Sequence, residues 1–242
     1  MRRPAGICCC LMLLCSSLSA QWLEMHAAPD RSVWATSSLT ETLGEREVTY
    51  GPEALFDGDL SSPWVEGAAG GGFGESVTVL TNRPVVGFSL INGFVRYASL
   101  FRKNNRIRSL EVDLLIGFTA PGLVSETDYI LYFLKEIEAE HALSVEDSPD
   151  RQYFDFPLDP QEQFELYRTV LLEFADDNPM LFRMMLEEAG LAEDSSASEL
   201  NQMLLMELYG FFAFRMTISD IYPGSVYDDT CLTELQLVLE EF

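Results

Sequence analysis

Two aspartates and a serine lie close together in the stretch Ala54–Trp64, and their spacing suits the binding of a hard cation. Asp57 and Asp59 flank Gly58, which tolerates a positive φ, so both carboxylates can turn toward one point. Ser62 can add a third oxygen. Ca²⁺ prefers an oxygen cage of this kind, although the spacing is not that of an EF-hand loop. The alternative is an Asx-rich surface turn ahead of a core tryptophan.

A third of the basic residues lie between positions 96 and 108, and aromatic and amide side chains lie among them. Arginine, asparagine and aromatic rings bind sugars or anionic glycans through hydrogen bonds, stacking and charge. The alternative is internal pairing, in which Asp228 or Asp229 holds Arg106 and braces two loops. The stretch contains Arg96, Tyr97, Phe101, Arg102, Lys103, Asn104, Asn105, Arg106 and Arg108.

A second dense stretch runs from Tyr222 to Leu235. Pro223-Gly224 predicts a turn, acidic residues follow it, and a strand is expected from Thr233. Glu234 interrupts an apolar run, so it is either an outward residue on the last strand or a cation ligand. The residues predicted to bind a ligand are Tyr97, Arg102, Asn104, Asn105, Arg106, Tyr222 and Asp228.

The elements that would position these residues are mainly strands. Period-two apolar patterns separated by turns predict antiparallel sheets with one buried face, and a β-sandwich accounts for them best. The glycine-rich stretch Gly67–Gly74 precedes a strand pattern and not a helix, which favours a flexible turn over a phosphate-binding loop. The strand patterns lie at residues 85–92, 110–114, 212–218 and 235–239.

Two segments show helical spacing, and we expect them to be insertions in the β-fold at about residues 123–143 and 159–210. In the first, Ser125 caps a helix with apolar residues Ile130, Phe133, Leu134 and Ile137. In the second, helices start at Asp159-Pro160, Asn178-Pro179 and Ser196 and stop before Gly190 and Gly210. Their Met-rich faces form either a satellite core or a groove for a protein partner.

Composition limits the possible partners. The chain has 242 residues, 48% of them hydrophobic, which is enough for one large domain or two small ones. Its formal net charge is −24, so it repels the phosphate backbone of nucleic acids and anionic membrane surfaces. The sequence therefore predicts no nucleic-acid binding and no unaided binding to such membranes.

Residues 1–20 match the pattern of a secretory signal peptide: Arg2-Arg3, a short apolar run and small residues before a cleavage site. A polar segment over residues 21–32 follows. We expect a secreted or periplasmic protein with no integral membrane span after cleavage, and a lipid anchor through Cys15 is the less favoured alternative. Outside the signal the sole cysteine is Cys231, predicted to be a buried hydrophobe.

Several ordered motifs resemble those of the discoidin-like (coagulation factor 5/8 type C) domains. The similarity is greatest to the translocation-type domain attached to NAD glycohydrolase and found in many bacterial secreted proteins. The resemblance covers about residues 33–118, 151–158 and 211–239, and the helical insertions lie outside it. Its motifs are Ala35-Thr36-Ser37-Ser38, Ala54-Leu55-Phe56-Asp57-Gly58-Asp59, Trp64-Val65-Glu66-Gly67, Gly72-Phe73-Gly74-Glu75, Ile91-Asn92-Gly93-Phe94, Arg102–Arg106, Ile221-Tyr222-Pro223-Gly224 and Tyr227–Leu235.

This resemblance implies a mainly β fold, a discoidin-like jelly-roll β-sandwich, here with α-helical insertions. It also implies a structural Ca²⁺ bound where the two ends of the domain meet. Ser62 stands where the family usually has threonine, which keeps the oxygen and loosens the rotamer. Carried over residue by residue, the metal ligands would be Ala54, Asp57, Asp59, Ser62, Thr233 and Glu234.

These observations lead to two functional hypotheses. The first is a secreted, non-catalytic binding module that recognises a glycan or another cell-surface or cell-wall component through its loops. The second is a structural or interaction protein whose helical insertions bind a protein partner. An enzyme is not expected, because the acidic pairs Asp228-Asp229 and Glu187-Glu188 come with no nucleophile or oxyanion donor.

Overall fold

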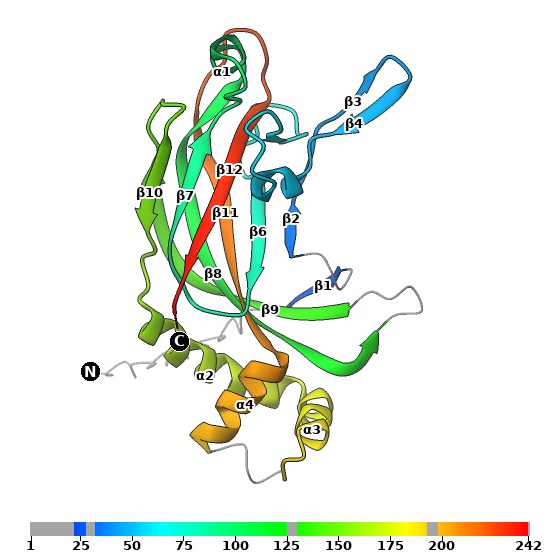
Figure 1. Ribbon diagram of the computed structural model, residues 1–242. Coiled ribbons are helices and arrows are strands. Elements are labelled where there is room, and N and C mark those ends of the chain that lie inside the picture. Colours follow the sequence, from blue (N-terminus) through cyan, green and yellow to red (C-terminus); the bar gives the residue numbers. More distant parts are fainter. Residues whose placement is uncertain (1–21, 28–31, 125–129, 193–197, 242) are drawn as a thin grey trace, which may run out of the picture.

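The structure is a computed structural model that describes residues 22–27, 32–124, 130–192 and 198–241. These residues form a mainly β fold, as predicted, with a ten-stranded mixed sheet, a separate two-stranded hairpin and several helices. The hairpin, β3 (Thr40–Leu43) and β4 (Arg46–Thr49), projects away from the body of the molecule (Figure 1).

The large sheet folds over into two layers, which form the predicted β-sandwich. β12 pairs with β7 along most of its length but with β8 only at Thr230 and Cys231. Beyond these positions the layers separate into β10-β7-β12 and β1-β9-β8-β11-β6-β2. The strands are β1 (Leu23–Ala27), β2 (Val33–Ala35), β5 (Trp64–Val65), β6 (Ser76–Thr81), β7 (Val85–Asn92), β8 (Asn105–Val124), β9 (Ile130–Ser144), β10 (Arg151–Asp155), β11 (Gly210–Tyr222) and β12 (Thr230–Leu239).

The main core lies between the layers and consists of alternating apolar side chains. Leu110, Val112 and Leu114 of β8 are fully buried there, in the period-two pattern that the sequence shows. Phe88 of β7 meets Phe214 of β11 across the two layers, with ring centroids 4.9 Å apart. Burial of these large side chains is the main force that holds the layers together.

The first predicted helical insertion is wrong. Residues 130–144 form strand β9, which pairs antiparallel with β8. The apolar residues of this run serve both faces of a strand: Phe133 joins the main core, and Leu134 joins a second apolar cluster on the opposite face. Spacing alone does not separate such a strand from a buried helix. The predicted cap, Ser125, lies outside the described residues.

The second helical insertion is present as α2 (Pro160–Asp177), α3 (Pro179–Glu188) and α4 (Glu199–Tyr209). Asp159 caps α2: its Oδ1 accepts from the Glu162 amide at 2.9 Å, and its amide donates to the Glu162 side chain. Tyr167 and Phe174 of α2 pack on Phe118 of β8, so the helices close one end of the sandwich (Figure 1). The third helix begins at Glu199, and Ser196 lies outside the described residues.

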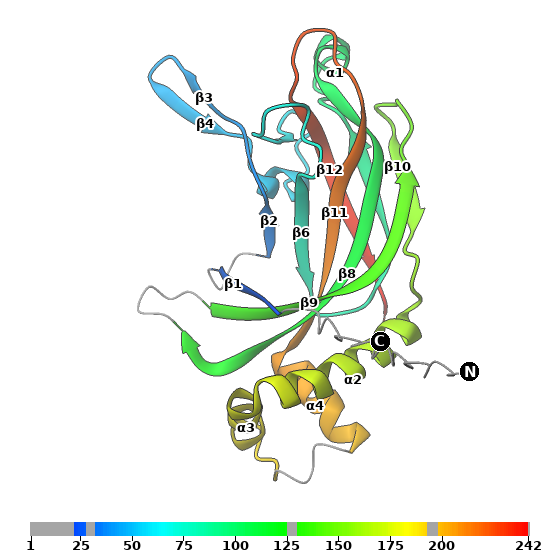
Figure 2. The same ribbon diagram turned by 180° about the vertical axis from the view of Figure 1, so that it is seen from behind.

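The polar segment before residue 33 contributes more than the sequence predicts. Leu23–Ala27 form β1, which pairs with β9 (Figure 2). The Trp22 ring lies 5.2 Å from Phe174 and 6.3 Å from Phe118, so it joins the core under α2. None of the described helices is long and apolar enough to cross a membrane.

Candidate functional site

The Asp57-Gly58-Asp59 turn lies against Glu234, near the other end of the chain. The turn follows the short helix η1 (Pro52–Phe56), and Gly58 and Glu234 line one groove. Glu234 is 7% exposed, and its Oε1 has no hydrogen-bond partner among the described residues. Burial raises the pKa of Glu234; Asp57 and Asp59 raise it further, and Arg151 opposes this.

The turn is also stabilised by its own hydrogen bonds. Asp57 accepts from the Asp59 amide and from the Ser62 hydroxyl, both at 2.7 Å. Asp59 accepts from the Ser61 amide at 2.9 Å, and hydrogen bonding to the side chain and the amide of Ser61 lowers the pKa of Asp59. The Asx-turn interpretation therefore holds for the local geometry, while the position beside Glu234 keeps the cation interpretation open.

The predicted calcium ligands are only partly assembled. Thr233 is buried, and its hydroxyl donates to the Gly93 carbonyl at 2.5 Å, so its side chain faces away from the turn. Within the described residues no group of three His, Cys, Asp or Glu side chains could hold a metal ion. The unpartnered Oε1 of Glu234 fits a cation, and Asp57 and Asp59 lie close enough to raise the pKa of Glu234. Ser62 donates to Asp57 within the turn, and Ala54 lies in η1 just before it. Calcium binding stays a prediction.

The seven residues predicted to bind a ligand gather at one end of the sandwich, around α1 (Ala98–Lys103) and the loop 223–229 (Figure 1). Arg106 is buried and braces this end. Its guanidinium donates to both carboxylate oxygens of Asp147 at 2.9 Å, and to the carbonyls of Asn104 and Pro223. The internal-pairing alternative is therefore correct for Arg106, but the partner is Asp147 and not Asp228 or Asp229.

The two asparagines at this end are also structural. Asn105 is buried; its amide donates to the Asp228 carbonyl at 2.7 Å and accepts from the Gly224 amide at 2.6 Å. Asn104 donates to Leu100 at the end of α1, and the Tyr222 hydroxyl donates to the Val145 carbonyl. These contacts fix the loop 223–229 against α1. They occupy hydrogen-bonding groups of Asn104, Asn105 and Tyr222, so these side chains have few polar atoms left to bind a ligand.

The exposed surface of the same end carries aromatic and basic groups. Tyr97 is 58% exposed, and the Arg96 guanidinium lies 5.3 Å from its ring centroid. Arg102 and Asp228 are exposed, and Tyr227 is 46% exposed. The Tyr227 amide donates to the Lys103 carbonyl at 2.9 Å, which ties this tyrosine to α1. An aromatic and guanidinium surface on a braced scaffold suits recognition of a planar or sugar-like ligand.

The glycine-rich stretch passes over a buried carboxylate, that of Glu66. Glu66 is fully buried and accepts hydrogen bonds from the amides of Ala68 at 2.8 Å and Thr230 at 3.1 Å. A Cβ at Gly72 would meet the Glu66 side chain at 2.6 Å, so glycine is required where the loop passes over it. Burial raises the pKa of Glu66 despite these two donors.

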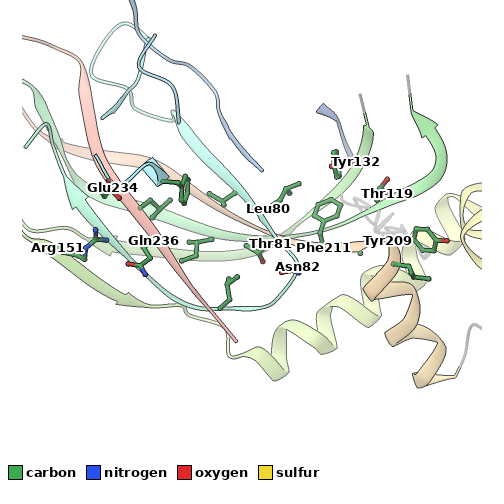
Figure 3. A pocket seen from close by; sticks show the side chains of 18 residues that line it. Leu80, Thr81, Asn82, Thr119, Tyr132, Arg151, Tyr209, Phe211, Glu234 and Gln236 are labelled. Atoms are coloured by element: carbon green, nitrogen blue, oxygen red, sulfur yellow. The ribbon is translucent and has the colours of Figure 1, made fainter. Parts of the chain in front are cut away.

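A groove of about 810 Å³ lies beside β12 and β6 (Figure 3). Glu234, Gln236 and Arg151 lie at one end of it, and Tyr132, Thr119, Phe211 and Tyr209 at the other. Most of the remaining lining is apolar. No pattern in the sequence indicated this groove, because it forms between strands that are far apart along the chain.

Other residues of the site were also missed. Asp147 lies in the turn between β9 and β10, and its pairing across 41 positions leaves no local signal. Tyr227 is visible in the sequence as an aromatic residue in a loop after Pro-Gly, a pattern that can mark exposed recognition residues.

Comparison with known families decides the assignment. The model of the NAD glycohydrolase translocation F5/8 type C domain matches residues 29–157, more than half of the chain. The chain belongs to this family. The resemblance found in the sequence is thereby confirmed. The matched domain is of a translocation and binding class rather than a catalytic one.

Two other comparisons add little. Comparison with curated proteins finds no match. Among solved structures, the arabinofuranosyltransferase AftD from Mycobacteria superposes with a TM-score of 0.42 and 12% identity. That match covers 90% of this chain and 11% of AftD, and it is too distant to carry an argument.

The translocation domain extends in space beyond the matched residues. The match ends just after β10, yet β12 lies between β7 and β8 in the strand order, and β11 lies between β8 and β6. The helices α2–α4 therefore interrupt one β-sandwich between β10 and β11.

Proposed function

We propose that this F5/8 type C domain is an exported, non-catalytic binding module that recognises glycans through the end of the sandwich around α1. The leader-like residues 1–20 support export. The family supports a module without catalytic activity. The observation that carries the glycan assignment is the exposed cluster of Arg96, Tyr97, Arg102 and Tyr227, in a chain that is otherwise strongly acidic.

The chemistry of this cluster suits a saccharide. A tyrosine ring packs against the apolar face of a sugar, and guanidinium groups donate hydrogen bonds to hydroxyls or carboxylates. The scaffold below is fixed by the Arg106–Asp147 ion pair and by Asn105, so the exposed groups lose little conformational freedom on binding.

The test is a glycan and cell-wall binding screen with surface variants. Tyr97→Ala and Arg102→Ala should reduce binding at least about tenfold, and Arg46→Ala on the β3–β4 hairpin should leave it unchanged. Arg106 is unsuitable for this test because its removal would disturb the brace. Equal binding by all three variants, or no binding of any glycan by the wild type, would overturn the proposal.

The helical insertion supports a second candidate function, binding of a protein partner. Met180 of α3 and Leu200 and Met203 of α4 are 72%, 74% and 64% exposed, although Leu205 of α4 is fully buried in the core. Exposed apolar side chains that gather on neighbouring helices indicate a docking surface.

The two functions separate by substitution. Met180→Ser with Leu200→Ser and Met203→Ser should abolish capture of a partner and leave glycan binding intact. Deletion of residues 160–209 is not equivalent, because it removes Tyr167 and Phe174 from the core. Partner capture that survives the triple substitution would contradict this second function.

A further inference from the structure

One edge of β12 has no partner over the second half of the strand. From Glu234 to Leu239 the strand pairs with β7. Its pairing with β8 ends at Cys231 and its pairing with β5 ends at Leu232. Within the described part of the chain no other strand pairs with residues 234–239. A strand edge of this kind presents unpaired N–H and C=O groups, which is a template for one more strand.

The groove lies on this open side of β12. Its described lining includes residues 234–237 and Leu239 of β12, residues 79–81 of β6 and Asn82 after β6, and no residue of β7 (Figure 3). Leu235, Leu237 and Leu239 alternate along the strand and belong to the main core or pack against it. The groove therefore offers an apolar floor with a period of two beside an unpaired backbone edge, which is what an added strand needs.

Charge indicates the kind of strand that fits. Acidic groups outnumber basic ones at both ends of the groove. Asp57, Asp59 and Glu234 lie at one end with Arg151, and Glu240 and Glu241 follow Leu239 at the other, where Arg83 donates to the Glu240 carbonyl. A second copy of the chain would bring another net charge of −24 to the same edge, which opposes self-pairing. A segment with basic residues is attracted instead.

We propose that the open edge of β12 binds an extended polypeptide segment of another protein as an added strand. The segment has a short stretch of alternating apolar residues between basic residues. Its backbone pairs with residues 234–239, and its apolar side chains enter the groove against Leu235, Leu237 and Leu239. This interaction is separate from the glycan surface around α1 and does not depend on it.

The probe is a synthetic peptide of alternating valine and threonine with a lysine at each end, tested in chelator so that calcium cannot contribute. Binding is followed by fluorescence polarisation and by amide hydrogen exchange. We expect slower exchange in residues 234–239 when the peptide is added. Methylation of alternate peptide nitrogens should weaken binding about tenfold or more, because it removes donors to the β12 edge. Replacement of the lysines by glutamates should weaken it similarly.

Two chain variants complete the test. Leu237→Thr, which lies in the groove, should weaken peptide binding, and Val238→Thr, on the same strand but outside the groove lining, should not. Unchanged exchange at residues 234–239 with millimolar peptide would overturn the proposal, as would equal binding of the methylated peptide. Protection of the same residues by concentration-dependent dimerisation without peptide would also overturn it, in favour of a second copy.

Discussion

Arg106 and Asp147 form a two-point ion pair in which Nε and Nη2 each donate to one carboxylate oxygen at 2.9 Å. The arginine side chain is buried and the aspartate is half-exposed. The pair joins the start of β8 to the turn before β10. Since Arg106 also donates to the Pro223 carbonyl, one guanidinium holds three separate segments at the proposed glycan-binding end.

Loss of the Asp147 carboxylate should destabilise the protein. We expect Asp147→Ala to lower the free energy of unfolding by about 2 kcal/mol, because it leaves a buried guanidinium without its charged acceptor. Denaturant unfolding measures the change. Arg108→Ala is the matched control: its pair with Asp220 is exposed on both sides, so its loss should cost less than about 1 kcal/mol. Equal losses of unfolding free energy in the two variants would show that the buried Arg106–Asp147 pair stabilises the protein no more than an exposed pair does.

Stability should rise when the pH falls from neutral toward the ordinary range of carboxyl groups. Burial raises the pKa of Glu66, Glu234 and Asp229 in the folded state, so the folded chain binds more protons than the unfolded chain. This contribution is fully present below the unfolded pKa and is lost as the pH rises through the raised folded pKa. Thermal unfolding between about pH 5 and about pH 8 tests it.

A variant isolates the contribution of Glu66 to this effect. Glu66→Gln removes the titrating group at the most buried position, so its melting temperature should depend less on pH than that of the wild type. Glu47→Gln, on the exposed hairpin, should leave the wild-type slope unchanged. A wild-type melting temperature that instead rises steadily with pH across this range would contradict the assigned direction.

Calcium should raise the melting temperature of chelator-treated protein. A cation at Glu234 would satisfy the unpartnered Oε1 and offset the repulsion from Asp57 and Asp59. At a calcium concentration about 100 times the dissociation constant, the gain is about 2.7 kcal/mol. Glu234→Gln should abolish the shift, whereas Glu47→Gln should keep it. Calorimetry without heat of binding, together with no shift in melting, would exclude this site.

The unpartnered hydroxyl of Tyr167 predicts a stabilising substitution. This hydroxyl is buried beside Gly210 and has no hydrogen-bond partner among the described residues. Tyr167→Phe should therefore leave stability unchanged or raise it by about 1 kcal/mol. Gly210→Ala should cost about 1–3 kcal/mol, because its Cβ would overlap the Tyr167 ring and hydroxyl. Combined with Tyr167→Phe, it should cost less than alone; purely additive effects would contradict this contact.

The parts of the fold that the sequence predicts are those with local signals. Leu110, Val112 and Leu114 show strand alternation, and Asp159-Pro160 shows a helix start, and both are correct. β9 was mistaken for a helix because Phe133 and Leu134 bury opposite faces of one strand, which removes the alternation. This segment is a strand because it pairs with β8, and no local sequence pattern predicts that pairing.

In the candidate site, too, the sequence predicts some features and not others. The approach of Asp57 to Glu234 was predicted from ordered motifs, and the structure contains it. Thr233 lies at a register shift of β12, between Leu232 and Glu234, and its hydroxyl donates to the Gly93 carbonyl instead of facing the turn. The role of Asp147 and the groove beside β12 depend on tertiary contacts and have no counterpart in sequence spacing.

The position of β12 affects how the two layers come together. This strand is the last along the described chain, yet it lies between β7 and β8, where it joins the two layers. Its pairing partners lie far earlier in the sequence, so the join between the layers is a long-range contact. Contacts of this kind raise the contact order of a domain and slow its folding, so we expect closure of the sandwich by β12 to be slow.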